Sequence, residues 1–340
     1  MTNRGTIHNP HEWDAFVQQH PDGHLLQLWC WGQLKEQAGW HAHRYVVRNT
    51  AGQIMAGAQL LLRRRWGFAA AYVPRGPLFS GDAQYDAQLC AELEQAARRS
   101  LAVFLRYEPN ICTDEAAAIP VAALLQRRGY RDALPIQPLA SIRLDLTPST
   151  EQILAAMSKG HRADIRRAAR NGVVVRTGDR QDLDRFYTIL HATATRAHFG
   201  IHTPAYYAAV LEKLGSAAQL WLAEVDGVAQ ATAITAAGPI DAVYLYSGST
   251  ADGLRSGAQH AIQWEAIRWA QARGCRRYDF WGIPAAFTAT DEAAAHADPL
   301  YGVYRFKKGF GGRIVRFMPA YDRVFLAPLY AFWRRRATAA

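Results

Sequence analysis

One order of predicted elements occurs twice along the chain, and this repetition limits the fold more than any other feature of the sequence. In each half a strand leads through a tight turn into a second and a third strand, which are followed by a helix and a last strand. The turns are Ala51-Gly52 and Asp226-Gly227, and the third strands end in YVPRGP and YLYSGST. The other predicted elements are strands at His43–Arg48 and Gln219–Val225, helices near Asp82–Arg99 and Ser256–Arg273, and last strands around Arg106-Tyr107-Glu108 and Arg277-Tyr278-Asp279.

Each copy predicts a sheet layered with helices, so we expect an α+β fold of two tandem duplicated domains with a cleft between them. Two ordinary α/β halves could also resemble each other by chance. The strand order resembles the N-acetyltransferase-like (GNAT) fold, in which the pyrophosphate of acyl-CoA lies on a glycine-rich loop that opens the central helix. The corresponding STADGLRSGAQHAIQW contains Gly253 and Gly257 but lacks the compact R-x-x-G-x-G/A pattern, which weakens an acyl-CoA donor and leaves it as an alternative.

Length and composition suit two domains with a substantial core, since half of the 340 residues are hydrophobic. The chain has no apolar run of about 18 residues and its N-terminus lacks the apolar region of a signal peptide, so we expect a cytoplasmic protein. The four cysteines form no C-x-x-C pair, and reduced, mostly buried thiols are expected. Lysine and arginine exceed aspartate and glutamate by 39 to 29. This excess favours a polyanionic partner, although arginine can also serve only to solubilise a surface.

The common motifs of metal, nucleotide and covalent catalysis are missing from the sequence. H-E-x-x-H, G-x-S-x-G and G-x-x-x-x-G-K-[ST] do not occur, and the 12 histidines have no partners at metal-ligand spacing. His191, His198 and His202 lie near a predicted helix end, where capping or surface positions are more common than a metal site. We therefore expect no metal, no cofactor and no covalent enzyme intermediate.

Basic and aromatic residues instead recur together in several segments. YRFKKGFGGR, at Tyr304–Arg313, places two lysines among aromatics and before three glycines. It fits either a surface hairpin or a loop whose backbone approaches an anion. Lys35 fits the wet face of a helix that buries Trp31 and Leu34. MSKGHRADIRRAARNGV fits an amphipathic helix that ends at Asn171-Gly172.

Together these segments resemble the Fem family of non-ribosomal peptidyltransferases, which build the cross-bridges of peptidoglycan. The resemblance covers nearly the whole chain and rests on HLLQLWCWGQLKEQAGW, YVPRGP, MSKGHRADIRRAARNGV, YLYSGST, RRYDFWGIP and DPLYGVYRFKKGFGG, in this order. It implies aminoacyl-tRNA as the donor. It implies as acceptor the side-chain amine of the stem peptide, carried by lipid II or by UDP-MurNAc-pentapeptide.

The resemblance also implies the domain organisation. We expect a first GNAT-like domain at 1–143 plus 318–340, because the end of the chain returns to it, and a second at 144–317. Arg185–Leu214 is too short for the long coiled-coil arm of some members, so the compact, armless type is expected. We expect the protein to act as a monomer.

Single residues are assigned by the same resemblance. Lys35 matches the lysine of W-x-x-L-K and Arg196 the arginine of T-x-x-R-x-x-[YF], two positions implicated in holding substrate phosphate. Phe199 occupies the aromatic position of the second motif and lacks the hydroxyl that some relatives have there. Tyr246 matches the second tyrosine of Y-x-Y-x-G-S, and Glu108 stands where some relatives have aspartate.

Three further basic or aromatic residues complete the candidate site. Arg75 in YVPRGP is a substrate-binding candidate, and Phe306 and Lys307 match the Phe-Lys pair beside the reacting centre. Aminoacyl transfer passes through a tetrahedral oxyanion, which the ammonium of Lys307 would stabilise. The ester of the donor is already activated, so positioning two substrates can supply much of the acceleration. The remaining candidates belong to a predicted loop that approaches a phosphate or the tRNA end: Lys308, Gly309, Gly311 and Gly312.

Several alternatives remain open from the sequence. The basic charge fits a tRNA bound through its backbone, without an RRM or KH signature. The tail VFLAPLYAFWRRRATAA fits either peripheral contact with an anionic membrane or a packed terminal helix with a basic end at Arg334–Arg336. The other functions considered are a GNAT-type N-acyltransferase that uses acyl-CoA and a non-catalytic protein that binds muramyl peptide or RNA.

Overall fold

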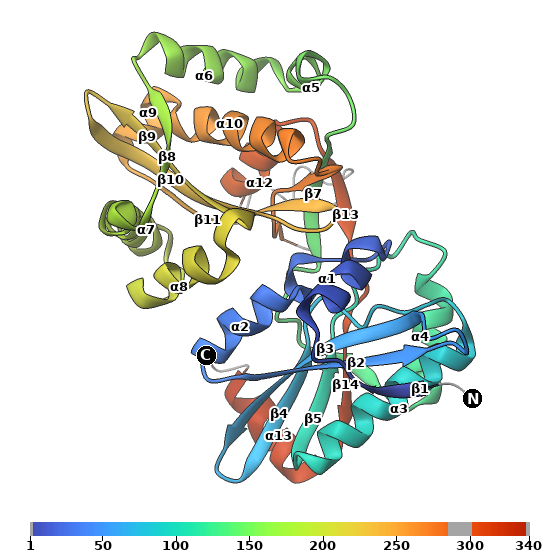
Figure 1. Cartoon of the computed structure of the whole chain (residues 1–340). Coiled ribbons are helices and arrows are strands. Elements are labelled where there is room, and N and C mark those ends of the chain that lie inside the picture. Colours follow the sequence, from blue (N-terminus) through green and yellow to red (C-terminus); the bar gives the residue numbers. More distant parts are fainter. Residues whose placement is uncertain (1–2, 285–300, 338–340) are drawn as a thin grey trace. The chain divides into compact units, whose positions relative to one another are not determined.

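The internal repeat corresponds to two seven-stranded sheets in the computed structural model, which describes residues 3–284 and 301–337 (Figure 1). In each sheet the third strand of the repeat runs parallel to the last one, and a long helix connects the two: α3 between β4 and β5, and α10 between β11 and β12. The other strand pairs recorded in the two sheets are antiparallel. The expected duplication of an α+β unit is thereby confirmed.

The first unit contains Met1–Leu139 and Arg316–Ala340, and its strand order is β1-β2-β3-β4-β5-β14-β6. Its elements are β1 (Asn3–Thr6), α1 (Pro10–Gln19), α2 (Trp29–Gln37), β2 (His41–Arg48), β3 (Ile54–Arg65), β4 (Phe68–Val73), α3 (Ala83–Arg99), β5 (Ala102–Tyr107), α4 (Ala118–Arg127), β6 (Arg131–Ala133), β14 (Ala320–Val324) and α13 (Ala327–Ala337).

Helix α3 forms where a capping residue precedes an apolar stripe. The side chain of Asp82 accepts hydrogen bonds from two backbone N–H groups of the first turn. Leu89, Leu93 and Ala97 follow at helical spacing and are fully buried against the sheet.

A buried ion pair connects β14, a strand near the end of the chain, to its neighbour β5 in the first sheet. Strand β14 pairs with β5, and Arg106 donates two hydrogen bonds, of 2.8 and 2.7 Å, to the carboxylate of Asp322. Tyr330 of α13 donates a third to the same carboxylate. A buried pair tolerates desolvation only with such complete hydrogen bonding, so these contacts fix both β14 and α13.

The second unit contains Ala140–Val315, and its sheet has the order β13-β7-β12-β11-β10-β9-β8. The expected boundary after Arg143 falls inside β7, which belongs to this sheet. The elements of this sheet and its helices are β7 (Ala140–Asp145), α5 (Thr150–Ala156), α6 (Lys159–Arg170), β8 (Val174–Gly178), α7 (Leu183–Ala197), α8 (Pro204–Leu214), β9 (Ala218–Val225), β10 (Val228–Ala237), β11 (Asp241–Ser249), α9 (Ala251–Ser256), α10 (Ala258–Ala272), β12 (Arg277–Asp279), α12 (Tyr301–Lys308) and β13 (Arg313–Arg316).

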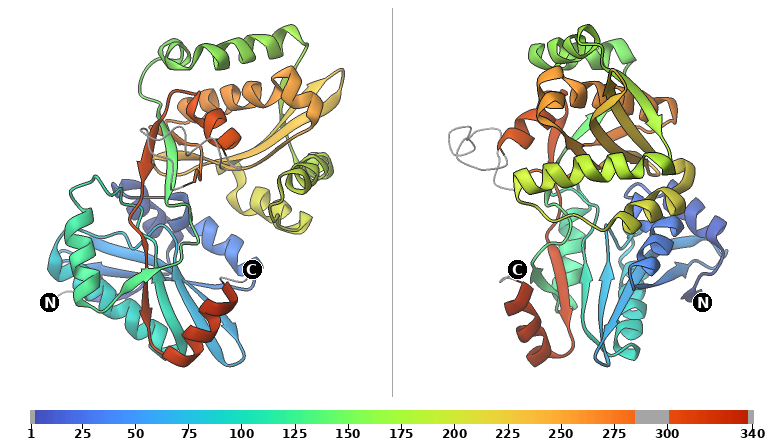
Figure 2. Two further views of the ribbon diagram at one scale, coloured as in Figure 1. Left: turned by 180° about the vertical axis from the view of Figure 1, so that it is seen from behind. Right: turned by 90° about the vertical axis from the view of Figure 1, so that its left-hand side faces the viewer.

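Helices cover both faces of the second sheet. Helix α10 packs on one face against β9 and β10, and α7 packs on the other against β10 and β11 (Figure 2). Ile262, Ala266 and Ala270 of α10 are buried, as their helical spacing predicts. Residues 183–214 form the two helices α7 and α8 rather than a long arm. Within residues 3–284 and 301–337, no helix is long and apolar enough to cross a bilayer.

Candidate active site

Lys307 is a buried cation in the last turn of α12. Its Nζ donates hydrogen bonds to the backbone carbonyls of Trp281 (2.9 Å) and Gly282 (2.7 Å). Burial lowers the pKa of Lys307 to about 8, and the negative charge of Asp279 opposes this shift. The ammonium is therefore both fixed in place and poorly solvated, which are the two properties that make a cation effective against a developing oxyanion.

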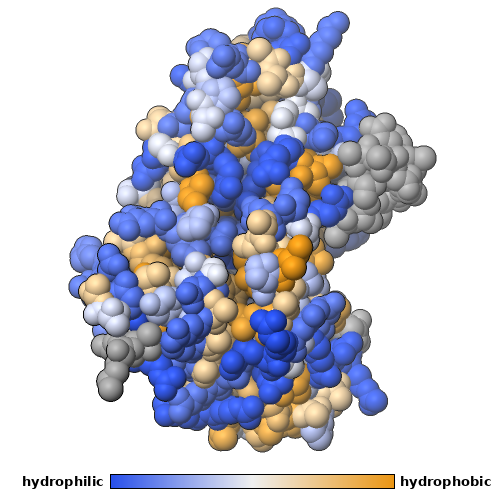
Figure 3. Space-filling model, turned by 90° about the vertical axis from the view of Figure 1, so that its right-hand side faces the viewer, coloured by the Kyte–Doolittle hydropathy of each residue, from blue (hydrophilic) through white to orange (hydrophobic). Residues whose placement is uncertain are grey.

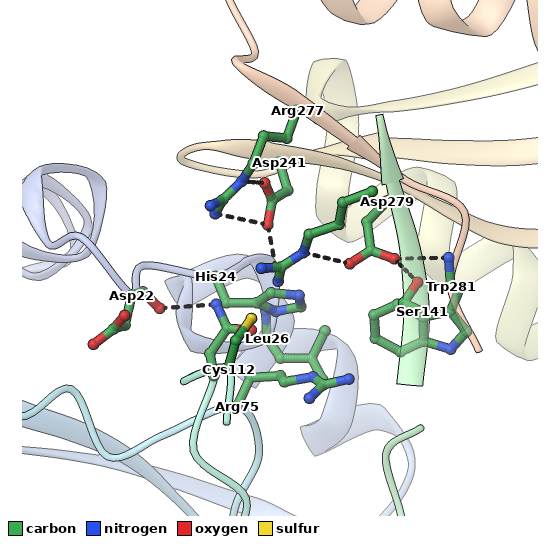
Figure 4. Close-up of polar contacts among 12 residues, drawn as sticks. Asp22, His24, Leu26, Arg75, Cys112, Ser141, Asp241, Arg277, Asp279 and Trp281 are labelled. Carbon is green, nitrogen blue, oxygen red and sulfur yellow. Dashed lines mark hydrogen bonds and ion pairs between the residues drawn. The ribbon is translucent and has the colours of Figure 1, made fainter. Parts of the chain in front are cut away.

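Asp279 anchors the segment that holds Lys307. Its carboxylate accepts hydrogen bonds from the hydroxyl of Ser141, from the guanidinium of Arg143 (3.0 Å) and from the backbone N–H of Trp281 (2.8 Å; Figure 4). Burial alone would raise the pKa of Asp279, but Arg143 and Ser141 outweigh it and the pKa is lowered. Arg143 also pairs with Asp241 at 3.3 Å. Asp279 is thus held as a carboxylate.

Trp281 has a backbone conformation that large residues rarely adopt. Its φ of 60° lies in the left-handed region, where bulky side chains are strained. The hydrogen bond from its N–H to Asp279 and the one from Lys307 to its carbonyl hold it there. Strain of this kind persists where surrounding contacts over-determine the backbone, and it is common in active sites.

His161 supports the helix that carries Lys307, and the sequence gives no sign of this role. Its Nε2 lies 2.7 Å from the carbonyl of Phe306, so Nε2 carries the proton and donates it. Its Nδ1 then accepts from the hydroxyl of Ser158 at 3.0 Å. The ring also contacts His260 and Phe310, at centroid distances of 4.7 Å each. His161 and Phe306 are 145 positions apart, a pairing that no sequence spacing could indicate.

The aromatic ring of Phe306 lies within this same cluster. It is 5.0 Å from the ring of His260 and 5.3 Å from that of Phe310. These contacts are those of a packing residue. A catalytic part for Phe306 stays a prediction.

Most of the segment predicted as a loop or hairpin at 304–312 is helical, so both predicted conformations are wrong, while anion binding by its residues stays a prediction. Lys308 lies at the end of α12, and the glycines that follow are closely packed. A Cβ on Gly309 would lie 1.9 Å from the ring of His161, and one on Gly312 would lie 2.6 Å from Ile142. Gly311 has a φ of +90°, which favours glycine. These glycines serve close packing and a turn, and Lys308 and Gly311 are the exposed members of the group. Residues 298–300 of the same motif lie outside the described part of the chain.

Arg196 and Tyr246 are brought to neighbouring elements of the second unit. Arg196, near the end of α7, donates a hydrogen bond to the carbonyl of Ser249 at the end of β11 (3.0 Å). Tyr246 lies three residues earlier in β11. Phe199 follows a left-handed residue, His198, that ends α7, and 47% of it is exposed. Arg196 and Phe199 are therefore accessible to a ligand.

Tyr246 belongs to an aromatic cluster that the sequence did not reveal. Its hydroxyl lies 3.3 Å from that of Tyr206 in α8, and its ring is 5.1 Å from that of Tyr207. His202 stacks on Tyr206 at 3.9 Å. Burial and the neighbouring Tyr206 raise the pKa of Tyr246 well above its ordinary value, so it stays a neutral hydrogen-bond donor. The adjacent residues Tyr206 and Tyr207 did not indicate this cluster, because aromatic residues are usual in cores.

Arg75 and Glu108 lie together in the first unit. The backbone N–H of Gly76 donates to the carbonyl of Glu108 at 3.0 Å. Arg75 is 3% exposed, and its guanidinium lies 3.8 Å from the ring of Phe317 and 2.9 Å from the carbonyl of Pro138. These contacts indicate a bracing role for Arg75, and substrate binding by it stays a prediction.

The carboxylate of Glu108 is also engaged by the protein. It accepts hydrogen bonds from the hydroxyl of Tyr72 and from the backbone N–H groups of Ile136 and Gln137. Burial, with the charge of Glu108, raises the pKa of Tyr72 well above its ordinary value, so the tyrosine remains the donor. Glu108 therefore fixes the backbone at Ile136 and Gln137.

Lys35 lies on α2 as predicted. Trp31 and Leu34 are buried, while Lys35 is half-buried with its Nζ 4.8 Å from the Trp31 ring. The face of the indole ring attracts the ammonium of Lys35, so this cation is held near the ring rather than freely solvated. Lys35 belongs to the first unit and Arg196 to the second.

Possible metal ligands are scattered in the part of the chain that the structure describes. There, no three histidine, cysteine, aspartate or glutamate side chains are grouped to hold a metal ion. The four cysteines are free, and three of them are buried, as expected.

The two sheets with their crossover helices define a tandem GNAT-like protein. The model of the FemAB family matches residues 9–121, 125–235 and 226–334, and the chain belongs to this family. The fold is similar to that of the crystal structure of FemX, with a TM-score of 0.85 and 20% identity over 97% of this chain and 99% of that one. It is also similar to a tandem GNAT protein from the clavulanic acid biosynthesis pathway, with a TM-score of 0.55 and 12% identity over 95% and 98% of the two chains.

Curated relatives cover almost the whole chain. A lipid II:glycine glycyltransferase of Staphylococcus haemolyticus (strain JCSC1435) is 23% identical in an alignment 395 residues long, gaps included, that covers 94% of this chain and 92% of the relative. The enzyme of the same name from Staphylococcus aureus (strain USA300) is 23% identical in an alignment of 398 residues, with the same coverage.

Proposed function

We propose that this chain transfers an aminoacyl group from aminoacyl-tRNA to the side-chain amine of the stem peptide of a lipid-linked peptidoglycan precursor. Membership of the FemAB family and the names of the curated relatives support a transferase that acts on lipid II. The structural observation that carries the proposal is the buried ammonium of Lys307, held by two carbonyls beside an ionised aspartate.

The reaction needs a fixed cation more than a covalent nucleophile. The acceptor amine attacks the ester carbonyl, a C–N bond forms, and the carbonyl oxygen becomes an oxyanion. Collapse of this intermediate breaks the C–O bond to the terminal ribose, whose oxygen takes up the proton that the attacking amine loses. An ammonium has three N–H donors, and the described residues engage two of those of Lys307. We propose that the third donates to the oxyanion, which exists only as the barrier is crossed.

The second unit offers little room for acyl-CoA at the start of its central helix. The segment expected to be a loop there is the short helix α9, and Gly257 follows it with a φ of +85°. A Cβ on Gly253 would lie 2.3 Å from the carbonyl of Gln230, and one on Gly257 would lie 2.7 Å from that of Asp164. The glycines are therefore packed against protein backbone rather than open to a pyrophosphate.

The first unit fills the equivalent position with a carboxylate. Asp86 of α3 accepts hydrogen bonds from the backbone N–H groups of Ser80 (2.7 Å) and Gly81 (3.2 Å). Backbone N–H groups at a helix start are the usual ligands of a phosphate. Since an aspartate already occupies them, an anionic cofactor would be repelled, which supports a donor other than acyl-CoA.

A basic face on α6 and α12 suits the backbone of tRNA. The carbonyl of Gly309 accepts from the N–H of Ser158 at 2.8 Å, which joins the end of α12 to the start of α6. The exposed basic residues of the two helices are Lys159, Arg166, Arg170, Arg305 and Lys308. Such a face binds phosphates without reading bases, so selectivity would rest with the aminoacyl end.

The remaining cations suit the acceptor. We propose that Arg196 and Lys35 contribute to binding its phosphates, and that Tyr246, a neutral donor, hydrogen-bonds the same substrate. Replacement of Arg196 or Lys35 by methionine should weaken binding of a phosphorylated acceptor more than binding of its dephosphorylated fragment. Equal losses for both ligands in calorimetry would remove this assignment.

A salt series tests the donor. Affinity for tRNA should fall steeply with salt, and the double variant R166A/R170A should reduce the slope of log affinity against log salt by about two. R180A, which removes an exposed arginine outside this face, is the matched control and should leave the slope nearly unchanged. Flat salt dependence, or efficient transfer from acyl-CoA, would favour the acyl-CoA alternative.

A further inference from the structure

The first unit carries a groove beside the C-terminal helix that none of the preceding chemistry uses. It has a cavity volume of about 510 Å³ and lies between the β3–β4 hairpin and α13. Helix α13 packs against β5 and is held there by the Tyr330–Asp322 hydrogen bond. The rings of Trp333 and Phe104 add a contact of 4.6 Å. The groove is therefore a preformed surface.

Large apolar side chains stand exposed along the rim of this groove. Trp66 at the hairpin tip is 73% exposed and Phe332 of α13 is 53% exposed, with Phe68 and Leu329 at 38% and 37%. On the face drawn in Figure 3, hydrophobic residues occur as separate patches among hydrophilic ones, which is ordinary for a protein surface. Four such side chains around one groove are a different feature, because a clustered apolar patch marks a binding surface.

The hairpin tip holds its tryptophan in a strained position. Trp66 and Gly67 have φ values of 52° and 80°, the left-handed conformation of a two-residue turn. Asparagine, aspartate or glycine is preferred at the first position, and a bulky residue there is an outlier. The tip therefore displays an indole to solvent at a cost in folding stability, and folding alone gives no reason for it.

Arginines flank the exposed apolar residues from both sides. Arg63, Arg64 and Arg65 line the groove from the hairpin, and no carboxylate is among the residues that line it. Beside α13, a second hollow of about 470 Å³ is lined by Arg131 together with Arg334 and Arg335. The side chain of Arg336 lies outside the described residues. The charge around the groove is thus of one sign and complementary to an anionic surface.

We propose that this groove docks the protein on the surface of an anionic phospholipid bilayer. Trp66 and Phe332 enter the boundary between headgroups and acyl chains, and the flanking arginines contact lipid phosphates. The walls of the groove include Val103 and Leu329, which offer hydrocarbon and no hydrogen-bonding groups. Hydrocarbon walls suit acyl chains better than a nucleic acid. The proposal does not depend on the transfer reaction, although it would bring the enzyme to the surface where lipid-linked acceptors lie.

Vesicle co-sedimentation of the full chain tests the docking surface. Wild type should bind vesicles that contain 30% phosphatidylglycerol in phosphatidylcholine, and bind pure phosphatidylcholine much more weakly. The variant W66S/F332S should lose about tenfold or more in affinity. I119S/V228S removes two other exposed apolar side chains, which are 79% and 65% exposed, and should bind like wild type.

The same vesicle assay tests the contribution of the arginines with the variant R63A/R64A, and R180A is the matched control. Each arginine near an anionic surface contributes roughly a fivefold change in affinity, so the double variant should bind the anionic vesicles at least tenfold more weakly and R180A should not. Unfolding curves should be similar for all variants, because every replaced side chain is exposed.

Three results would overturn the proposal. The first is equal vesicle binding by W66S/F332S and wild type. The second is loss of tRNA binding by W66S/F332S with vesicle binding intact, which would make the groove an RNA surface. The third is a dimer in light scattering that only W66S/F332S dissociates, which would make it an interface between copies of this chain.

Discussion

Replacing Lys307 by methionine distinguishes the contribution of its charge to catalysis from the free-energy cost of burying that charge. The change of its pKa from 10.5 to about 8 corresponds to roughly 3 kcal/mol spent in keeping the ammonium buried at pH 7. Because the folded pKa lies below the unfolded one, the unfolded chain binds more protons between pH 8 and 10.5. Stability therefore rises with pH across that window. Methionine removes this cost but leaves the carbonyls of Trp281 and Gly282 without their donor, at about 1–3 kcal/mol each.

The two effects nearly cancel, so the variant should fold about as stably as wild type. Its turnover should nevertheless fall by about 100-fold, the scale of losing one oxyanion partner. A large loss of activity at nearly unchanged stability would show that the cation is retained for chemistry. A variant that is several kcal/mol less stable would instead assign Lys307 to structure.

The pH dependence tells whether Lys307 acts as a cation or as a base. The assay is the ratio of kcat/KM for wild type to that of K307M, measured from pH 6.5 to 9.5. The ratio cancels the ionisation of the acceptor amine and the lability of the ester. If the protonated form is active, the ratio falls by roughly tenfold between pH 7 and 9. A ratio that rises over this range would refute the oxyanion assignment, because the neutral amine would then be the active form.

The packing of the second unit and the ion pair of the first give three further expectations. G309A, just after α12, should reduce both turnover and melting temperature, because its Cβ would lie 1.9 Å from the ring of His161. G302A, within α12, meets no atom of the described residues within 4 Å and should be neutral or stabilising, so equal effects of the two variants in activity and calorimetry would contradict the packing after α12. Burial and the positive charges of His161 and Arg167 lower the pKa of His260 to about 4, although Asp164 opposes the shift. The free energy of unfolding should therefore fall by roughly 3 kcal/mol as pH drops from 6.5 to 4, and denaturant curves of H260Q should show a much weaker fall. D322A leaves a buried arginine unpaired and should cost about 3–5 kcal/mol, while a melting temperature within a degree of wild type would contradict the buried pair.

Local periodicity and turn residues were enough to predict most of the secondary structure. The buried positions of α10 follow the 3.6-residue period, and the predicted end of α6 at Asn171-Gly172 coincides with the Asn171 cap. The strand that ends at Arg48 and the turn at Asp226-Gly227 were also correct. These features depend on neighbouring residues, which a sequence displays directly.

The predictions that were wrong, and the contacts that the sequence did not reveal, depend on segments that are far apart in the chain. Gly309 looks like part of a flexible loop until the ring of His161, far away in the chain, is placed against it. The pairing of Arg106 with Asp322 spans 216 positions, and Glu108 finds its donors in a segment with no pattern of its own. Glycine and charge have both local and tertiary uses, and only the fold decides between them.

The central claim is tested most directly by locating the new bond in the product. The protein is incubated with lipid II and a mixture of charged tRNAs, and the muropeptide is analysed by tandem mass spectrometry. The account predicts a mass increase of one or more aminoacyl residues on the side-chain amine of the stem peptide, lost when ribonuclease is added first or when K307M replaces wild type. Transfer that survives ribonuclease, or that requires acyl-CoA, would contradict it.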